Sequence, residues 1–390
     1  MPNFNKNINR IKTHSSKYDT IEQLFGISPK EGLAMWTADM DFKSPRCVVK
    51  TIREYAKHGI FGYFGDYNDY YRATIAWYYK RHGWKIQSDW IAVTHGLVAA
   101  IGIIIRAFSK PGDEVIVFTP VYHSFAKMIK NNQRVVKESV LKETYGKYEL
   151  NLDELNKRMT GNEKILLFCS PHNPGGRVWN AEELRQVGSF CKKHNLILVS
   201  DEIHNDILFP GAKHHVFPLA VPEIIDRLIV LVSSTKTFNI AGGLMGNVII
   251  QNAEIRKLFN NSHRATGNTP NSLGMLMAES AYRYGEPWLD QLLVYLNRNR
   301  ILFDTEVNKI PGLKSMKLSA TYLAWLNFAD TGMSEEEIIR RVHKKAKIAA
   351  NVGSTFGTGG ETYMRFNLAC PKNIVIESIN RLKLAFDDLQ

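Results

Sequence analysis

The residues of this chain that can do chemistry each follow directly after a short apolar run. In chain order they are a glycine turn with a helix start, an aromatic ring, an amide, a carboxylate with a histidine, and a lysine between hydroxyl groups. The residues concerned are Gly96, Leu97, Tyr122, Asn173, Asp201, His204, Thr235 and Lys236. If the runs are parallel strands of one sheet, these residues meet at one edge, where ligands bind to such sheets.

This set of groups suits one cofactor, pyridoxal phosphate. A lysine amine forms a Schiff base with its aldehyde, and a carboxylate keeps its pyridine nitrogen protonated, so that the ring can accept electrons. Backbone amides at a helix start bind a phosphate, together with hydroxyl groups. An aromatic side chain stacks on the ring. Each residue alone has an ordinary structural explanation, and the prediction depends on the agreement of their order and placement.

The elements that must position these residues are predicted to form a parallel α/β sheet. The apolar runs are 90–94, 115–118, 165–170, 196–200 and 228–233. They do not alternate with polar residues, which is typical of strands buried on both faces. The segments between them are long enough for crossover helices. One such helix is indicated by Asn180 and Glu183, which resemble a capping box.

The C-terminal third predicts a smaller α+β domain. A basic amphipathic helix begins at Ser334, residues 362–368 alternate as a half-exposed strand, and residues 374–389 form a final helix. Residues 292–303 are expected on the helix that joins the two domains, and the first 45 residues as an arm on the small domain. The predicted division is an N-terminal arm (1–48), a large domain (49–286) and a small domain (287–390).

The composition excludes several classes of protein. The chain has 390 residues, 44% hydrophobic and 23% charged, which is typical of a globular protein with two or three domains. The longest apolar run, 96–105, is about half the length that a membrane span needs, and the N-terminus lacks the apolar segment of a signal peptide. Four scattered cysteines without a CxxC spacing favour a cytoplasmic location and argue against a metal site.

Four motifs resemble the class I/II aminotransferase-like fold of pyridoxal phosphate enzymes, and within it the MalY/PatB-type cystathionine β-lyases, or C–S lyases. They are residues 35–42 (Met-Trp-Thr-Ala-Asp-Met-Asp-Phe), 170–179, 200–204 (Ser-Asp-Glu-Ile-His) and 236–242. General aminotransferases usually have tyrosine where His204 stands. The resemblance implies a large domain with a mostly parallel seven-stranded sheet, a small α+β domain, and a homodimer whose active sites are shared across the interface.

The resemblance implies a role for each cofactor-binding residue. Lys236 is the Schiff-base lysine and general base, and Asp201 pairs with the pyridinium nitrogen. Asn173 and His204 contact the phenolic oxygen, and Tyr122 stacks on the ring. The phosphate is held by the backbone amides of Gly96 and Leu97, by the hydroxyl groups of Ser233 and Thr235, and by Tyr63.

Substrate binding is implied for a smaller set. Arg365 would hold the α-carboxylate with its guanidinium fork, near Asn173, and Tyr63 would reach the substrate amine from the partner subunit. In many aminotransferases an arginine stands where this chain has Leu244, and serine is usual in the place of Thr235.

The expected reaction is β-elimination on a sulfur amino acid such as cystathionine or cystine, which gives a thiol, pyruvate and ammonia. An aminotransferase that uses the same lysine, aspartate and arginine is the first alternative. The second is a regulatory or nucleic-acid-binding protein, given the net charge of +12 and the basic stretch 340–347. That stretch is predicted to be the solvated face of a helix, no nucleic-acid-binding signature accompanies it, and neither nucleic acid nor a membrane is expected as a partner.

Overall fold

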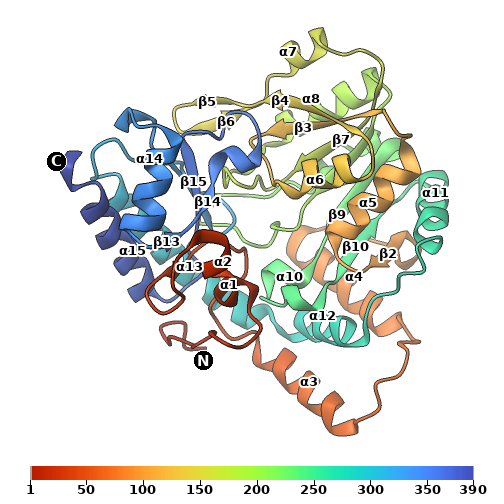
Figure 1. Cartoon of the computed structure of the whole chain (residues 1–390). Helices are drawn as coiled ribbons and strands as arrows, with labels where there is room; N and C mark the ends of the chain where they lie inside the picture. Colours follow the sequence, from red (N-terminus) through yellow and green to blue (C-terminus); the bar gives the residue numbers. More distant parts are fainter. Residues whose placement is uncertain (1, 390) are drawn as a thin grey trace.

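A seven-stranded sheet lies at the centre of the computed structural model, which describes residues 2–389 (Figure 1). The strand order is β2-β10-β9-β8-β7-β3-β4. The strands are β2 Ile91–Thr94, β3 Glu114–Thr119, β4 Val135–Val140, β7 Glu163–Cys169, β8 Ile197–Asp201, β9 Leu228–Val232 and β10 Gly246–Ile249. Only β10 runs antiparallel to its neighbours, β2 and β9. The other six strands therefore end at the same edge.

The five predicted apolar runs are confirmed as strands, with ends that differ by one or two residues. Ile165 and Leu167 belong to one apolar core, and Leu166 and Phe168, which alternate with them, belong to another. Because both faces of the sheet are buried, apolar residues fill every position. The apolar pattern misses β4, an edge strand with charged residues, and β10, which is only four residues long.

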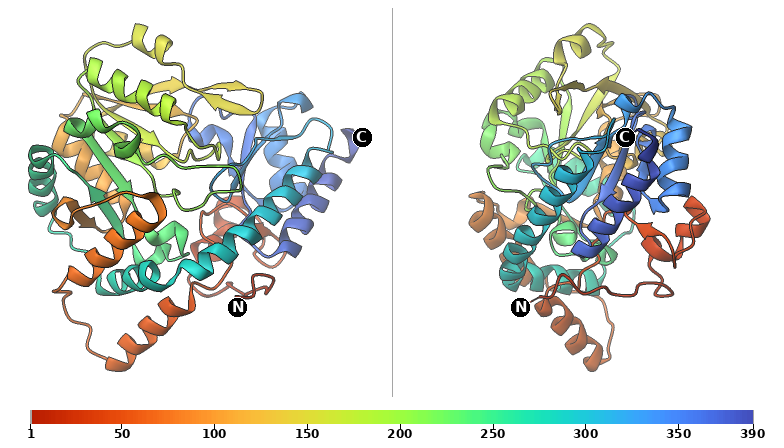
Figure 2. Two further views of the ribbon diagram at one scale, coloured as in Figure 1. Left: turned by 180° about the vertical axis from the view of Figure 1, so that it is seen from behind. Right: turned by 90° about the vertical axis from the view of Figure 1, so that its left-hand side faces the viewer.

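Helices cover both faces of this sheet (Figures 1 and 2). The helices α5 Leu97–Phe108, α6 Ser124–Asn131 and α11 Ala253–Arg264 share an apolar core with one face. On the other face lie α4 Asn68–His82 and α8 Ala181–Lys193. The remaining α-helices and strands of this part are α3 Arg46–His58, α7 Leu152–Lys157, α9 Phe217–Ala220, α10 Ser234–Thr237, α12 Ser272–Tyr284 and the hairpin β5 Lys142–Thr144, β6 Lys147–Glu149.

The predicted capping box at the start of α8 is confirmed. The Asn180 side chain accepts a hydrogen bond from the Glu183 amide (2.9 Å), and the Glu183 carboxylate accepts one from the Asn180 amide (2.8 Å). The box satisfies two backbone donors that the first turn of a helix leaves free.

A four-stranded antiparallel sheet forms the core of the C-terminal part. Its strands are β11 Lys314–Ser315, β12 Leu323–Asn327, β14 Asn351–Val352 and β15 Tyr363–Asn367, in the order β11-β12-β15-β14. The long helix α13 Glu286–Val307, which includes the predicted joining segment, packs against α15 Lys372–Ala385 (Figure 2).

The prediction of a half-exposed strand at residues 362–368 is wrong, because all five residues of β15 are buried. The polar residues of this strand do not face solvent. Arg365 donates to the Trp36 carbonyl, and the Asn367 side chain donates to the Thr37 carbonyl. The N-terminal segment therefore covers the polar side of β15.

The first 45 residues lie along the C-terminal part of the molecule as an arm (Figure 1). The arm contains α1 Ser16–Asp19, α2 Ile21–Phe25 and β1 Leu33–Ala34. Strand β1 pairs in parallel with β13 Ile348–Ala349. Met1 and Gln390, at the ends of the predicted terminal segments, lie outside the described residues.

The cationic side chains of the basic stretch 340–347 bind groups of the same chain. The helix α14 Glu335–Ile339 begins at Ser334, as predicted, and continues as a π-helix over Arg340–Lys345. Its cations are paired as Arg340 with Glu337, Arg341 with Asp388, Lys344 with the Phe25 carbonyl, Lys345 with Asp387 and Lys347 with Glu31. These contacts favour a structural role for the stretch over a nucleic-acid surface.

Within residues 2–389, none of the helices is both long and apolar enough to cross a membrane.

Candidate active site

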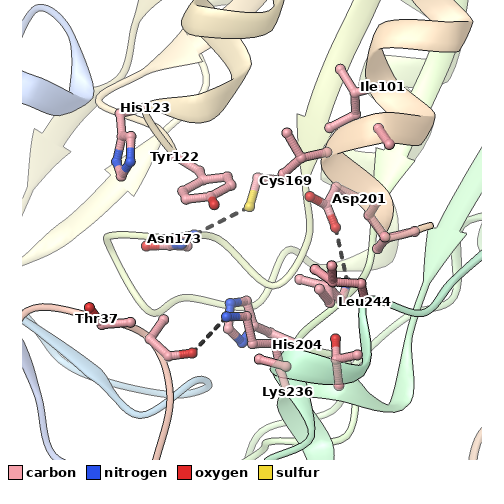
Figure 3. A pocket seen from close by; sticks show the side chains of 18 of the residues that line it. Thr37, Ile101, Tyr122, His123, Cys169, Asn173, Asp201, His204, Lys236 and Leu244 are labelled. Carbon is pink, nitrogen blue, oxygen red and sulfur yellow. Dashed lines mark hydrogen bonds between the residues drawn. The ribbon is translucent and has the colours of Figure 1, made fainter. Parts of the chain in front are cut away.

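A cavity of about 390 Å³ lies at the carboxyl edge of the large sheet, where residues of the N-terminal segment and of β15 close it (Figure 3). Nine of the eleven predicted site residues line it: Gly96, Leu97, Tyr122, Asn173, Asp201, His204, Thr235, Lys236 and Arg365. They come from segments spread over 270 residues of sequence, and the parallel topology brings them together.

Lys236 lies on the short helix α10, directly after β9. Its amine donates a hydrogen bond to the Ala38 carbonyl, 2.6 Å away. Burial lowers the pKa of the amine to about 8, an effect that the charge of Asp39 opposes. A lysine with such a pKa is partly neutral near physiological pH and can act as a nucleophile or base.

Asp201 ends strand β8, and one of its carboxylate oxygens accepts a hydrogen bond from the Ile203 amide (3.1 Å). Burial raises the pKa of Asp201 to about 7, and the nearby Glu202 adds to this. A cation placed against this carboxylate would favour its charged form. A protonated pyridine nitrogen is such a group.

Arg365 and Asn173 contact each other in the lining of the cavity. The Arg365 guanidinium donates to the Asn173 side-chain oxygen (2.9 Å), the Asn351 side-chain oxygen (2.8 Å) and the Trp36 carbonyl (3.0 Å). Burial lowers the pKa of Arg365 to about 10, so the guanidinium stays protonated at neutral pH. These neutral acceptors orient the guanidinium and leave its charge available for a carboxylate.

The start of helix α5 provides an anion site. Gly96 is its N-cap residue and has φ = 85°, a left-handed conformation that glycine adopts without strain. Leu97 and Val98, the first two residues of the helix, line the cavity together with Thr235. Free amides and the helix dipole both favour an anion such as a phosphate at this point.

Ser233 does not line the cavity. Its hydroxyl donates to the Met245 carbonyl (2.6 Å), is 2.8 Å from the Thr235 hydroxyl, and accepts from the Thr235 amide (3.1 Å). Ser233 thus caps α10 and orients Thr235, whereas its predicted contact with the phosphate stays a prediction.

Tyr63 also lies outside the cavity of its own chain. It is fully exposed in the segment between α3 and α4, which projects from the body of the molecule (Figure 1). A site residue in this position would have to act on another chain, and the role of Tyr63 stays a prediction.

Four buried polar atoms of lining residues have no hydrogen-bond partner among the described residues. They are the Thr37 hydroxyl, Nδ1 of His123, Nδ1 of His204 and Nε of Arg365. Buried polar groups without partners are costly, so this arrangement fits a polar ligand. Together with the Lys236 amine, the buried Asp201 carboxylate and the start of α5, these atoms line a cavity that fits pyridoxal phosphate and an amino acid substrate. Lys236 would hold the aldehyde, Asp201 the ring nitrogen and α5 the phosphate.

Two residues escaped the sequence analysis, His123 in the cavity wall and Tyr322 behind it. His123 follows Tyr122, and burial lowers its pKa to about 4, which makes it a neutral group. Tyr322 donates to the same Ala38 carbonyl that Lys236 uses (3.0 Å). The motif 35–42 contains Ala38, but Tyr322 has no local signal, because only the fold brings this residue, which precedes β12, to the Ala38 carbonyl.

The raised pKa of Asp201 predicts a pH-dependent stability of the full-length chain without cofactor. The folded carboxyl binds its proton up to about pH 7, whereas the unfolded one releases it near its ordinary pKa of 3.8. Stability from this group is therefore lost as pH rises from about 4 to about 7, and the loss amounts to about 4 kcal/mol. Urea unfolding across this range should show that wild type loses stability relative to Asp201→Asn.

A matched control is Asp206→Asn. Asp206 is equally buried, but hydrogen bonds from His82 and Thr237 outweigh its burial and lower its pKa. Its contribution to stability is lost only as pH falls below the ordinary pKa of 3.8, so the difference between wild type and this variant should stay nearly constant from pH 4 to pH 7. Equal slopes for both variants would contradict the prediction for Asp201.

Comparison with known proteins defines the class of the chain. The family model for aminotransferase class I and II matches residues 32–381. The chain belongs to this family, and the predicted aminotransferase-like fold is confirmed.

Individual relatives show which members of this family the chain resembles. Cystathionine beta-lyase PatB of Bacillus subtilis is 35% identical over 386 residues, which are 98% of this chain and 99% of the relative. The structure of cystalysin from Treponema denticola, which contains pyridoxal 5'-phosphate, has a TM-score of 0.95 at 36% identity and 100% coverage of both chains. The pyridoxal phosphate-bound C-S lyase of Staphylococcus hominis has a TM-score of 0.91 at 32% identity and 98% coverage of both. The predicted similarity to MalY/PatB-type proteins is confirmed.

Proposed function

We propose that this protein is a pyridoxal phosphate-dependent carbon–sulfur β-lyase. It cleaves cystathionine- or cystine-like amino acids to a thiol, pyruvate and ammonia. The observation that carries this proposal is the meeting of Lys236, Asp201 and Arg365 in one cavity of a chain that aligns along its whole length with a cystathionine β-lyase.

When bound, pyridoxal phosphate would attach the substrate amine and accept the electron pair of the broken Cα–H bond. The chain itself supplies orientation and proton transfer. Arg365 binds the α-carboxylate and fixes the direction of the Cα–H bond. The Lys236 amine, with its pKa lowered to about 8 by burial, removes the Cα proton. The bond from Cβ to sulfur then breaks, the thiolate takes a proton from Lys236 or from Tyr63, and the released enamine hydrolyses to pyruvate and ammonia.

An aminotransferase would use the same lysine, aspartate and arginine, so the reaction type needs its own experiment. The purified protein is incubated with cystathionine, and pyruvate is measured with and without an added 2-oxo acid. A lyase releases pyruvate without the 2-oxo acid, and ammonia appears in equal amount. Pyruvate that forms only when the 2-oxo acid is present would contradict the lyase. His204, in the place of the usual tyrosine, favours the lyase.

We further propose a homodimer in which Tyr63 reaches the cavity of the partner. Ile60, Phe61 and Tyr63 are exposed by 67%, 66% and 105% on the segment between α3 and α4. Clustered exposed apolar side chains mark a contact surface, and a twofold dimer would place this segment against the second copy.

Shared sites predict recovery of activity when two inactive variants are mixed. Lys236→Ala and Tyr63→Phe chains are unfolded and refolded together. Each heterodimer then has one intact site, with Lys236 from one chain and Tyr63 from the other, so activity should return to about a quarter of wild type. Steady-state pyruvate release measures it.

The control for this experiment mixes Lys236→Ala with Asp201→Asn, two residues that serve the same cavity of the same chain. Each site of that heterodimer has one defect, and activity should not return. Equal recovery in both mixtures, or none in the first, would contradict the role of Tyr63.

We also infer a cytoplasmic location and the division into residues 1–48, 49–286 and 287–390. All four cysteines are free thiols, which fits a reducing compartment. The two separate sheets and the arm support the division.

A further inference from the structure

Within the N-terminal arm, four charged side chains join its first part, at Arg10 and Lys17, to residues 39–41 beside the cavity. The Arg10 guanidinium donates to both carboxylate oxygens of Asp39 (3.0 and 2.7 Å) and to Asp41 (2.7 Å). The Lys17 amine donates to Asp41 (2.9 Å) and lies 3.7 Å from an oxygen of Asp39. Lys17 is fully buried, and Asp41 is 5% exposed. Removing one member of such a cluster leaves a buried charge unpaired, so the cluster holds residues 39–41 in one position.

The segment that this cluster holds offers its backbone to the site. The Ala38 carbonyl accepts the hydrogen bond from the Lys236 amine (2.6 Å), and the Trp36 carbonyl accepts one from Arg365 (3.0 Å). Asp39 is the next residue after Ala38. Its side chain is clamped by Arg10, and this fixes the peptide whose carbonyl faces Lys236.

The charged and titratable groups around Lys236 come from several elements. Asp39 lies in the N-terminal segment, Asp201 at the end of β8 and Arg365 on β15. His204 also faces the amine, and burial lowers its pKa to about 3, so it is neutral. Asp39 and Asp201 raise the pKa of the amine, whereas burial and Arg365 lower it. Asp201 is the group that would pair with the ring nitrogen, which leaves Asp39 as the anion assigned to no ligand.

We propose that Asp39, clamped by Arg10 and Lys17 of the arm, is a positioning residue for Lys236. It fixes the Ala38 carbonyl at the amine and keeps a negative charge beside it. The motif at residues 35–42 then connects Arg10 and Lys17 to the reacting amine of Lys236. This inference rests on the proposed function of Lys236.

The test compares Asp39→Asn with Asp41→Asn, which both remove one anion of the cluster. The full-length chain is freed of cofactor and treated with cyanate at a series of pH values, and carbamylation of Lys236 is followed by peptide mass spectrometry. Asp39→Asn should shift the midpoint for Lys236 to lower pH, by about half a unit or more. Asp41→Asn should lower the Tm similarly but shift the midpoint less, since Asp41 is not among the groups that act on the pKa of Lys236. Equal shifts, or none in either variant, would overturn the proposal.

A second pair of variants keeps the test valid if loss of an anion prevents folding. Arg10 is 20% exposed, and Arg10→Gln leaves Asp39 in place without its clamp. We expect a several-fold lower kcat with a smaller change in KM, and partial recovery of kcat in Arg10→Lys. Unchanged kcat in Arg10→Gln would overturn the clamp. The labelling result does not depend on the reaction, so a failed lyase assay and a failed role of Asp39 remain distinguishable.

Discussion

Lys236→Ala should abolish covalent attachment of the cofactor and lower the rate of pyruvate release by about 10³-fold or more. The physical reason is that the variant loses the nucleophile and the base together. The Lys236 amine is the one that faces the cavity from α10, with its pKa lowered to about 8 by burial. Borohydride treatment followed by mass spectrometry of the peptide with residue 236 checks the attachment, and a pyruvate assay checks the rate.

The matched control is Lys130→Ala, which removes an exposed lysine in the last turn of α6. It should keep both the yellow colour of the bound cofactor and the activity. A reducible cofactor linkage that persists in Lys236→Ala would show that another amine holds the cofactor, and the proposed function would then lose its central residue.

Arg365→Ala should lower kcat/KM by about 10²-fold or more for an amino acid substrate. The guanidinium is buried and charged, and the loss of such a partner for a carboxylate costs several factors of ten in affinity. Arg365→Lys should recover only part of the loss, because an ammonium cannot bind a carboxylate in a bidentate manner. Steady-state kinetics with cystathionine measure both variants.

A substrate analogue without the α-carboxylate separates this role from a general loss of structure. Wild type should discriminate strongly against the analogue, whereas Arg365→Ala should treat the acid and the analogue almost alike. Arg340→Ala, which removes an exposed arginine paired with Glu337, should leave kcat/KM unchanged. If Arg365→Ala still discriminated like wild type, the carboxylate would have to bind elsewhere.

The central sheet and most of its site residues could be predicted from sequence, because their signals are local. Strands buried on both faces must be continuously apolar, and the residue after each strand must lie at the carboxyl edge. For this reason the sequence alone predicts that Asp201 and Lys236 belong to one site. The edge strand β4 gave no such signal, since Lys137, Glu138 and Ser139 interrupt its apolar residues.

The alternation at residues 362–368 shows the limit of local reasoning. Polar residues in every second position normally face solvent, but in β15 they face the N-terminal segment and the cavity. The alternation of polar and apolar residues indicates only that the polar side chains need polar partners. Whether the partner is water or a backbone carbonyl 329 residues away, as for Arg365 and Trp36, depends on the packing of the chain.

The types of the reacting groups and their order along the chain follow from the amino-acid sequence, and so does the family. The contacts between distant segments do not, since many chain paths are compatible with the same local patterns. The hydrogen bond from Lys236 to the Ala38 carbonyl, the clamp of Arg10 on Asp39 and the burial that lowers the pKa of the lysine all arise from packing. The residue types therefore determine which reaction is possible. The environment that allows this reaction at neutral pH forms only when the chain folds.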